Sequence, residues 1–246
     1  MQASVIEFRF RMLIMTTLVV LGYWAPWIEA LDLGRRISLL EWLALHLRRA
    51  GLLPFGYATA AVIVIGSLFA AVGMVLRIWG AAYLGYGTVH HGRMQAGALM
   101  ADGPYRYLRN PLYVGGWFMF MAMALLMPPA GALFALPLLT VFLLRLILAE
   151  EAFLENVLGE SYKEYALAVP RLVPCLRSSL NSAGNKPHWV MAILTEVNPI
   201  GIFIIMAFLS WTYDEELMLK AILVSFGVSL VVRAVMPRSK SSPEPA

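Results

Sequence analysis

The sequence predicts an all-α membrane protein: a polytopic transmembrane helical bundle of about six spans with one interfacial amphipathic helix. Two observations predict this class. The 246 residues are 60% hydrophobic and only 14% charged, whereas soluble domains carry about 25% charged residues. Six apolar stretches also approach or exceed the roughly 20 residues that a helix needs to cross a bilayer. They comprise residues 12–31, 54–84, 111–127, 129–149, 189–213 and 217–236.

The first stretch is expected to be a retained helix rather than a cleaved signal peptide. Arg9 and Arg11 precede it, but two tryptophans and a proline at positions 24–27 stand where a cleavage site needs small residues. Between the first two spans, residues 38–49 carry leucines at helical spacing with arginines at both ends. This pattern is typical of a helix that lies in the membrane interface. The third and fourth spans share a very short turn at residues 127–129, so they are expected to be antiparallel.

A second amphipathic stretch, residues 154–165, follows the fourth span and is interrupted at Gly159. The polar linker 178–187 is rich in Ser, Asn and Gly and predicts a boundary. We therefore divide the chain into three parts. These are an N-terminal span with the interfacial helix (1–53), a core (54–177), and two C-terminal helices with a disordered tail (178–246).

The distribution of Lys and Arg indicates that both termini lie on the cytoplasmic side of the membrane. The turns at 128–129 and 214–216, which this orientation places outside, contain neither residue, although the first loop is an exception with four arginines. The net charge of +4 thus reflects membrane-flanking loops and not a nucleic-acid partner. The single cysteine, Cys175, excludes an intramolecular disulfide, and the four histidines form no metal-ligand pattern. We expect no metal.

A dense polar and aromatic block, residues 103–113, stands directly before the third span. It opens with a Gly-Pro turn signal, and Pro111 suits the first turn of a helix. Arg106 and Arg109 offer charge for a carboxylate or phosphate, and three tyrosines offer rings and hydroxyls. The alternative interpretation is an ordinary basic anchor with an aromatic belt.

Two acids, Glu150 and Glu151, end the fourth span on the same predicted side. An acid near the end of a membrane helix is costly unless a partner or water satisfies it. Because Glu150 is expected to face the polar block, the two can form one pocket. A carboxylate in such a pocket can hold ribose hydroxyls, an amino group or a cation. Arg145 projects from the same segment. The alternative is a loop acid paired with Arg106 or Arg109.

One further charge, Arg77, falls inside the second predicted span. Long arginines near helix ends commonly extend to the interface, which is the expectation here. The alternative is an inward-facing partner for Glu150 or for an anionic substrate head. In the same span, Gly66, Gly73 and Gly80 recur every seventh residue and predict close packing against another helix.

In their order, these features resemble the isoprenylcysteine carboxyl methyltransferase family, which belongs with the phospholipid methyltransferase-like membrane enzymes. The resemblance covers roughly residues 76–174. It rests on residues 99–105, on Arg109-Asn110-Pro111-Leu112-Tyr113, on the helical hairpin, on Glu150-Glu151, and on Gly159 with Tyr162 and Tyr165. That family binds S-adenosylmethionine at the cytosolic membrane face and methylates a lipidic substrate that enters from the bilayer.

The resemblance implies a set of site residues. The catalytic candidates are Arg109, Glu150 and Arg145. The chain departs from the family at Gly97 and Asn110, where the family usually has histidine, and at Leu146, near which the family has a substrate-binding arginine. The expected cofactor pocket comprises His90, Gly97, Ala98, Leu99, Met100, Tyr105, Asn110, Pro111, Leu112, Tyr113 and Glu150.

We therefore expect an S-adenosylmethionine-dependent integral membrane methyltransferase that acts at the cytoplasmic face on a lipidic or prenylated acceptor. The chemistry agrees, because anionic or aromatic surroundings stabilise the sulfonium cation of the donor. Two alternatives stay open. One is a membrane-embedded NADPH-dependent reductase, since sterol reductases share a similar arrangement of helices. The other is a non-catalytic membrane scaffold that keeps the motif.

Overall fold

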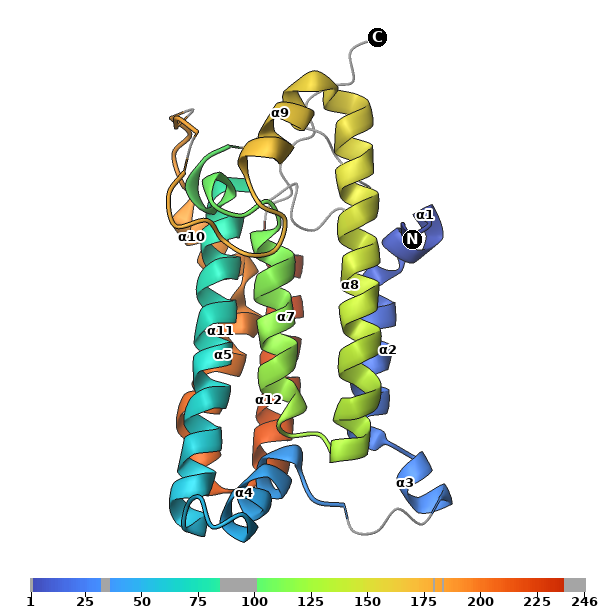
Figure 1. The fold of residues 1–246 in the computed structure, drawn as a ribbon, viewed down its shortest axis with the longest axis vertical. Helices are drawn as coiled ribbons and strands as arrows, with labels where there is room; N and C mark the ends of the chain where they lie inside the picture. The colour runs from blue at the N-terminus through green and yellow to red at the C-terminus, as the bar shows by residue number, and fades with distance from the viewer. Residues whose placement is uncertain (1, 32–35, 85–100, 179, 183, 237–246) are drawn as a thin grey trace.

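The computed structural model describes residues 2–31, 36–84, 101–178, 180–182 and 184–236. Every regular element in these ranges is a helix, which confirms the predicted all-α class. The bundle is built around α5 (Phe55–Leu84), α7 (Pro111–Ala124) and α8 (Pro129–Leu158). Helix α2 (Arg11–Trp24) runs along α8, and α4 (Leu39–Arg49) packs against α5 at one end of the bundle (Figure 1).

The remaining helices flank this bundle. The short α1 (Val5–Arg9) lies beside α8 (Figure 1), and α3 (Trp27–Ala30) follows α2. Helices α11 (Val197–Phe208) and α12 (Glu215–Val235) pack against each other, and α11 packs on α5. The shorter elements are η1 (Gly103–Arg106), α9 (Glu160–Ala168), α10 (Trp189–Thr195) and η2 (Leu209–Thr212).

The expected number of six spans is not confirmed. Among the described residues, α5, α8 and α12 are long and apolar enough to cross a membrane, and α10 with α11 adds a fourth if this bent pair is one span. Helices α2 and α7 have 14 residues each, so they rise about 21 Å against a hydrocarbon core about 30 Å thick. The predicted fifth span is broken at Glu196, where its two parts are bent by 69°.

Helices α7 and α8 form the predicted antiparallel hairpin (Figure 1). The hairpin turn also holds the start of α4, because the Leu39 and Leu40 amides donate to the Met127 and Leu125 carbonyls at 2.7 and 2.8 Å. Helix α8 continues past the predicted end at residue 149 and stops at Gly159, which has a positive φ of 59°. The acids at 150 and 151 therefore lie within a helix, more than a turn before its end.

Close packing of α5 on α7 confirms the role expected of the glycines. A side-chain carbon on Gly73 would lie 2.8 Å from the Gly115 carbonyl oxygen, and one on Gly80 would lie 3.0 Å from Leu112 Cδ2. The backbones of the two helices thus approach each other directly. This contact sets the first turn of α7 against the last turns of α5.

The polar linker folds back onto η1. The carboxylate of Asp102, which is buried, accepts hydrogen bonds from the Ser182 hydroxyl at 2.6 Å and from the Asn185 amide and side chain at 2.9 and 2.8 Å. Arg106 Nε donates to the Leu180 carbonyl at 3.0 Å. The linker is therefore tied to the core that precedes it, and the division of the chain at residue 178 stays a prediction.

Candidate active site

The first turn of α7 meets the C-terminal third of α8 at the end of the bundle where α9 lies (Figure 1). Here the hydroxyl of Tyr113 donates a 2.8 Å hydrogen bond to Glu150 Oε2. Among the described residues, Tyr113 is the only hydrogen-bond donor to this carboxylate. The tyrosine ring packs beside the buried cluster of Phe8, Phe142 and Leu146. The arrangement thus leaves Glu150 with acceptor capacity for a ligand.

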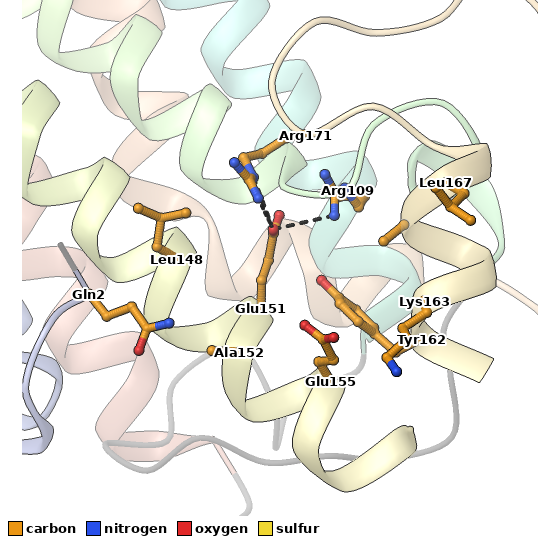
Figure 2. Close-up of a pocket in the computed structure, with 11 residues that line it drawn as sticks. Gln2, Arg109, Leu148, Glu151, Ala152, Glu155, Tyr162, Lys163, Leu167 and Arg171 are labelled. Carbon is orange, nitrogen blue, oxygen red and sulfur yellow. Dashed lines mark hydrogen bonds and ion pairs between the residues drawn. The ribbon is translucent and has the colours of Figure 1, made fainter. Parts of the chain in front are cut away.

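The neighbouring acid, Glu151, accepts hydrogen bonds from three protein side chains. Asn110 Nδ2 donates to its Oε1 at 2.9 Å, and Oε2 accepts from Arg171 Nε at 2.9 Å and from Arg109 Nη1 at 3.3 Å. Figure 2 shows Arg109 and Arg171 converging on this carboxylate. The side chain of Glu151 is only 9% exposed, so these donors compensate the loss of water. Glu151 therefore fixes the architecture, whereas Glu150 keeps chemical capacity.

A pocket of about 520 Å³ opens beside Glu151 (Figure 2). Tyr162 lines this pocket. Burial raises the pKa of its hydroxyl to about 12, so the group is a neutral hydrogen-bond donor at physiological pH. The Nε of Arg109 is buried and has no hydrogen-bond partner within the described part of the chain. The lining comprises Gln2, Arg109, Leu148, Glu151, Ala152, Glu155, Tyr162, Lys163, Ala166, Leu167 and Arg171.

The polar block is rigidly held where it enters α7. Tyr105 is buried, which raises its pKa well above the usual value of 10.0, and its carbonyl accepts a 2.8 Å hydrogen bond from the Tyr165 hydroxyl. The Arg109 amide donates to the Pro170 carbonyl at 2.9 Å, and the Cys175 amide donates to the Tyr107 carbonyl at 3.0 Å. The loop after α9 thus braces the block from outside.

Arg145, the third catalytic candidate, points elsewhere. Its Nη2 donates to both carboxylate oxygens of Glu7 in α1, at 3.0 and 2.8 Å. Our reading of the sequence missed Glu7 as a partner. The available signal was the Ser-x-x-Glu capping box, in which Ser4 and Glu7 satisfy each other's backbone amides. That motif identifies a helix start but not the arginine that binds it.

The structure therefore brings together most of the described candidates. Asn110 immediately precedes α7, and Pro111, Leu112 and Tyr113 form its first turn beside Glu150. The predicted cofactor residues His90, Gly97, Ala98, Leu99 and Met100 lie outside the described residues.

Comparison with known proteins gives this geometry a chemical context. Residues 61–161 match the phospholipid methyltransferase family. The matched region runs from within α5 to the start of α9, and it contains Asn110, Tyr113, Glu150 and Glu151. The predicted family resemblance is confirmed over this part of the chain.

Two curated relatives each match about 30% of the chain. The methanethiol S-methyltransferase of Crocosphaera subtropica is 41% identical over 70 residues, which are 28% of this chain and 27% of the relative. The protein-S-isoprenylcysteine O-methyltransferase of Schizosaccharomyces pombe is 36% identical over 80 residues, or 32% and 34% of the two chains. The matches thus span about a quarter to a third of each relative. No solved structure gives a significant match.

Proposed function

We propose that the protein is an integral membrane methyltransferase that uses S-adenosylmethionine and acts at the cytoplasmic membrane face on a lipidic or lipid-linked acceptor. The observation that carries this proposal is the bond between Tyr113 and Glu150 inside the region that matches the methyltransferase family. It places a carboxylate with remaining acceptor capacity beside an aromatic ring at the end of two adjacent helices.

The residues present fit this cofactor. Glu150 offers an anionic acceptor for ribose hydroxyls or for a cation, and Tyr113 offers an aromatic ring beside it. The buried Nε of Arg109 has no hydrogen-bond partner among the residues that the structure describes, so it is a donor that an anionic ligand group can satisfy. When bound, S-adenosylmethionine supplies a methyl group carried on a sulfonium sulfur. The proposed cofactor set also retains Tyr105, Asn110, Pro111 and Leu112, together with His90 and residues 97–100.

The chain's own groups prepare the site in three ways. Tyr113 orients the Glu150 carboxylate through a charge-assisted hydrogen bond. Asn110 and Arg171 hold Glu151 and thereby fix the rotation of α8 about its axis. The apolar cluster around Phe8 and Leu146 limits the access of water next to Tyr113. We retain Arg109 and Glu150 as proposed catalytic residues, and Arg145 only as a proposal from the family resemblance, because its Nη2 binds Glu7.

We propose a lipidic acceptor because the site lies at the ends of two apolar helices, α7 and α8. A lipid in the bilayer can approach the site along such helices. A second candidate acceptor is a small thiol, which the match to the methanethiol S-methyltransferase favours. A thiol becomes nucleophilic by losing its proton, a step that a carboxylate such as Glu150 can assist.

Calorimetry on the purified full-length protein tests the cofactor. S-adenosylmethionine should bind and NADPH should not, and the reverse would support a membrane reductase. Glu150→Ala should abolish methyl transfer from labelled donor into a lipid extract. The control Glu164→Ala, which removes an exposed acid of α9 that does not line the pocket, should transfer label normally. No transfer by the intact protein would favour a non-catalytic scaffold, and equal transfer in Glu150→Ala and the intact protein would remove Glu150 from the proposed catalytic residues.

Mass spectrometry of the labelled product tests the acceptor. Two reactions run in parallel, one with membrane lipid extract and one with a methylatable small thiol. Label in a lipid species supports the lipidic acceptor. Label that enters only the thiol replaces that assignment with the second candidate.

A further inference from the structure

A buried ion pair crosses from α5 to the break between α10 and α11. Arg77 Nε donates to Glu196 Oε2 at 2.6 Å, and its Nη2 donates to Oε1 at 3.0 Å. The side chain of Glu196 is fully buried, and that of Arg77 is 22% exposed. The expectation that Arg77 extends to the membrane interface is therefore wrong. Its alternative pairing with Glu150 is wrong as well, because the guanidinium binds Glu196.

Such a pair is weak evidence for stability, since removing each charge from water costs several kcal/mol. An ionisable pair within membrane helices instead points to a specific role. Only one partner of this ion pair lies in the region that matches the methyltransferase family, because residues 61–161 contain Arg77 but not Glu196. A role for the pair therefore has to connect the C-terminal helices with the region that carries the candidate site.

Arg77 reaches Glu196 by crossing the glycine face of α7. A side-chain carbon on Gly115 would lie 2.8 Å from Arg77 Cγ, and one on Gly116 would lie 3.6 Å from Arg77 Nη1. Any larger residue at 115 would block this path. On the way, Nη1 donates to the Leu112 carbonyl at 3.4 Å. One guanidinium thus binds both the C-terminal break and the first turn of α7.

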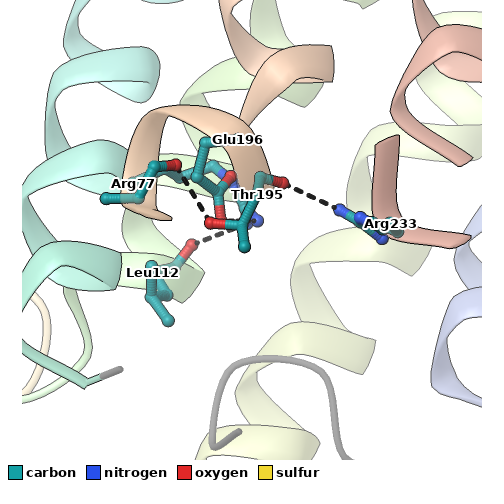
Figure 3. Close-up of polar contacts among 6 residues, drawn as sticks. Arg77, Leu112, Thr195, Glu196 and Arg233 are labelled. Atoms are coloured by element: carbon teal, nitrogen blue, oxygen red, sulfur yellow. Dashed lines mark hydrogen bonds and ion pairs between the residues drawn. The ribbon is translucent and has the colours of Figure 1, made fainter. Parts of the chain in front are cut away.

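The break itself is held from a second side (Figure 3). Arg233 Nη2 of α12 donates to the Thr195 carbonyl at 3.3 Å, one residue before Glu196. A bend in a membrane helix frees backbone groups that need partners away from water. The two arginines therefore hold the bend in one position relative to α5 and α12.

We propose that Glu196 is a positioning residue for the candidate site. Acting through Arg77, it fixes the height and rotation of the first α7 turn, which carries Leu112 and Tyr113 and so orients Glu150. The inference deepens the proposed function and rests on it for its binding readout. A displacement of about 1 Å in such a turn is enough to impair a site that depends on orientation.

Glu196→Gln tests the proposal, because the amide keeps the shape of the side chain and removes its charge. Arg77 then lies buried without a counter-ion and turns toward water, which withdraws Nη1 from the Leu112 carbonyl. The ligand is S-adenosylhomocysteine, which is S-adenosylmethionine without its transferable methyl group. We expect calorimetry to show that it binds the purified variant about tenfold more weakly than the intact protein. The matched control is Glu216→Gln, which removes an exposed acid from α12. Its affinity should equal that of the intact protein. Unchanged affinity in folded Glu196→Gln would overturn the proposal.

A stability-matched variant separates positioning from general loosening of the fold. Ile222→Ala removes a buried α12 side chain from the core and should lower the unfolding midpoint without changing the affinity for S-adenosylhomocysteine. If Ile222→Ala weakens binding as much as Glu196→Gln at equal loss of stability, Glu196 has only a structural role.

Amide hydrogen exchange of residues 112–116, measured without any ligand, distinguishes failure of this proposal from failure of the proposed function. Exchange there should be about tenfold faster in Glu196→Gln than in the intact protein or Glu216→Gln. If the intact protein binds no S-adenosylhomocysteine, the proposed function fails while the exchange experiment still decides the positioning role. Equal exchange in all three proteins would refute it.

Discussion

Tyr113 and Glu150 are hydrogen-bonded at 2.8 Å across the interface between α7 and α8, with the tyrosine hydroxyl as donor. This bond joins the end of the polar block to the acid of the adjacent pair that, within the described part of the chain, accepts a hydrogen bond from Tyr113 alone. Its neighbour Glu151 receives donors from Asn110, Arg109 and Arg171. The two adjacent acids thus have separate tasks because successive residues of a helix point about 100° apart.

Tyr113→Phe should weaken cofactor binding while the fold survives. A hydrogen bond to a charged group contributes about 1.5–3 kcal/mol, and losing the orientation of Glu150 should increase the Kd for S-adenosylmethionine about tenfold or more. Calorimetry on the purified variant measures this change. The control is Tyr57→Phe, an exposed tyrosine near the start of α5. A Kd equal to that of the intact protein would remove Tyr113 from the site.

Asn110→Ala should destabilise the protein. The amide of Asn110 is buried and donates to Glu151 at 2.9 Å and to the Arg171 carbonyl at 3.3 Å. Leaving buried partners unsatisfied costs about 1–3 kcal/mol, so thermal unfolding in detergent should start at a lower temperature. Asn156→Ala, which alters an exposed residue of α8, should leave the transition in place. The same midpoint in both variants would show that the Asn110 bonds contribute nothing net.

The carboxyl of Glu7 should titrate at unusually low pH. Its pKa is lowered from the usual 4.5, first by the hydrogen bond from the Ser4 backbone amide and then by Arg145. A depressed folded pKa means that the interaction stabilises the fold above about pH 4.5. That contribution is lost as the pH falls through the folded pKa. NMR titration of the side-chain carboxyl should show this shift, and Arg145→Gln should reverse it in part. A midpoint unchanged by Arg145→Gln would mean that the ion pair does not persist in solution.

Gly131→Ala should separate α2 from α8. An added side-chain carbon would lie 1.9 Å from the Gly22 carbonyl oxygen, a backbone atom that cannot rotate away. Overpacking of this kind costs about 1–3 kcal/mol or more, which thermal unfolding detects. Gly227→Ala is the matched control, because no atom lies within 4 Å of its added carbon. Equal unfolding midpoints would contradict the close approach of the two helices.

Local features of the sequence predicted much of the fold. The limits of α5 agree with the predicted span to within one residue, and α8 begins at Pro129 as expected. The interruption at Gly159 was also visible, because glycine readily adopts the positive φ found there. The count of six spans is not confirmed, for a physical reason. An apolar run shows which residues avoid water, but not where a helix bends or ends, as at Ala25 and Glu196.

The candidate site, like the fold, was predicted only in part from the sequence. By themselves, the polar block, the acids after the fourth apolar run and their order along the chain predicted a helical membrane protein that resembles the phospholipid methyltransferase family, and residues 61–161 match that family. Only the tertiary structure decided which acid each arginine binds: Arg77 binds Glu196, Arg109 binds Glu151, and Arg145 binds Glu7. Composition and periodicity are properties of neighbouring residues, whereas an ion pair depends on the rotation and depth of two helices that meet far apart in the chain.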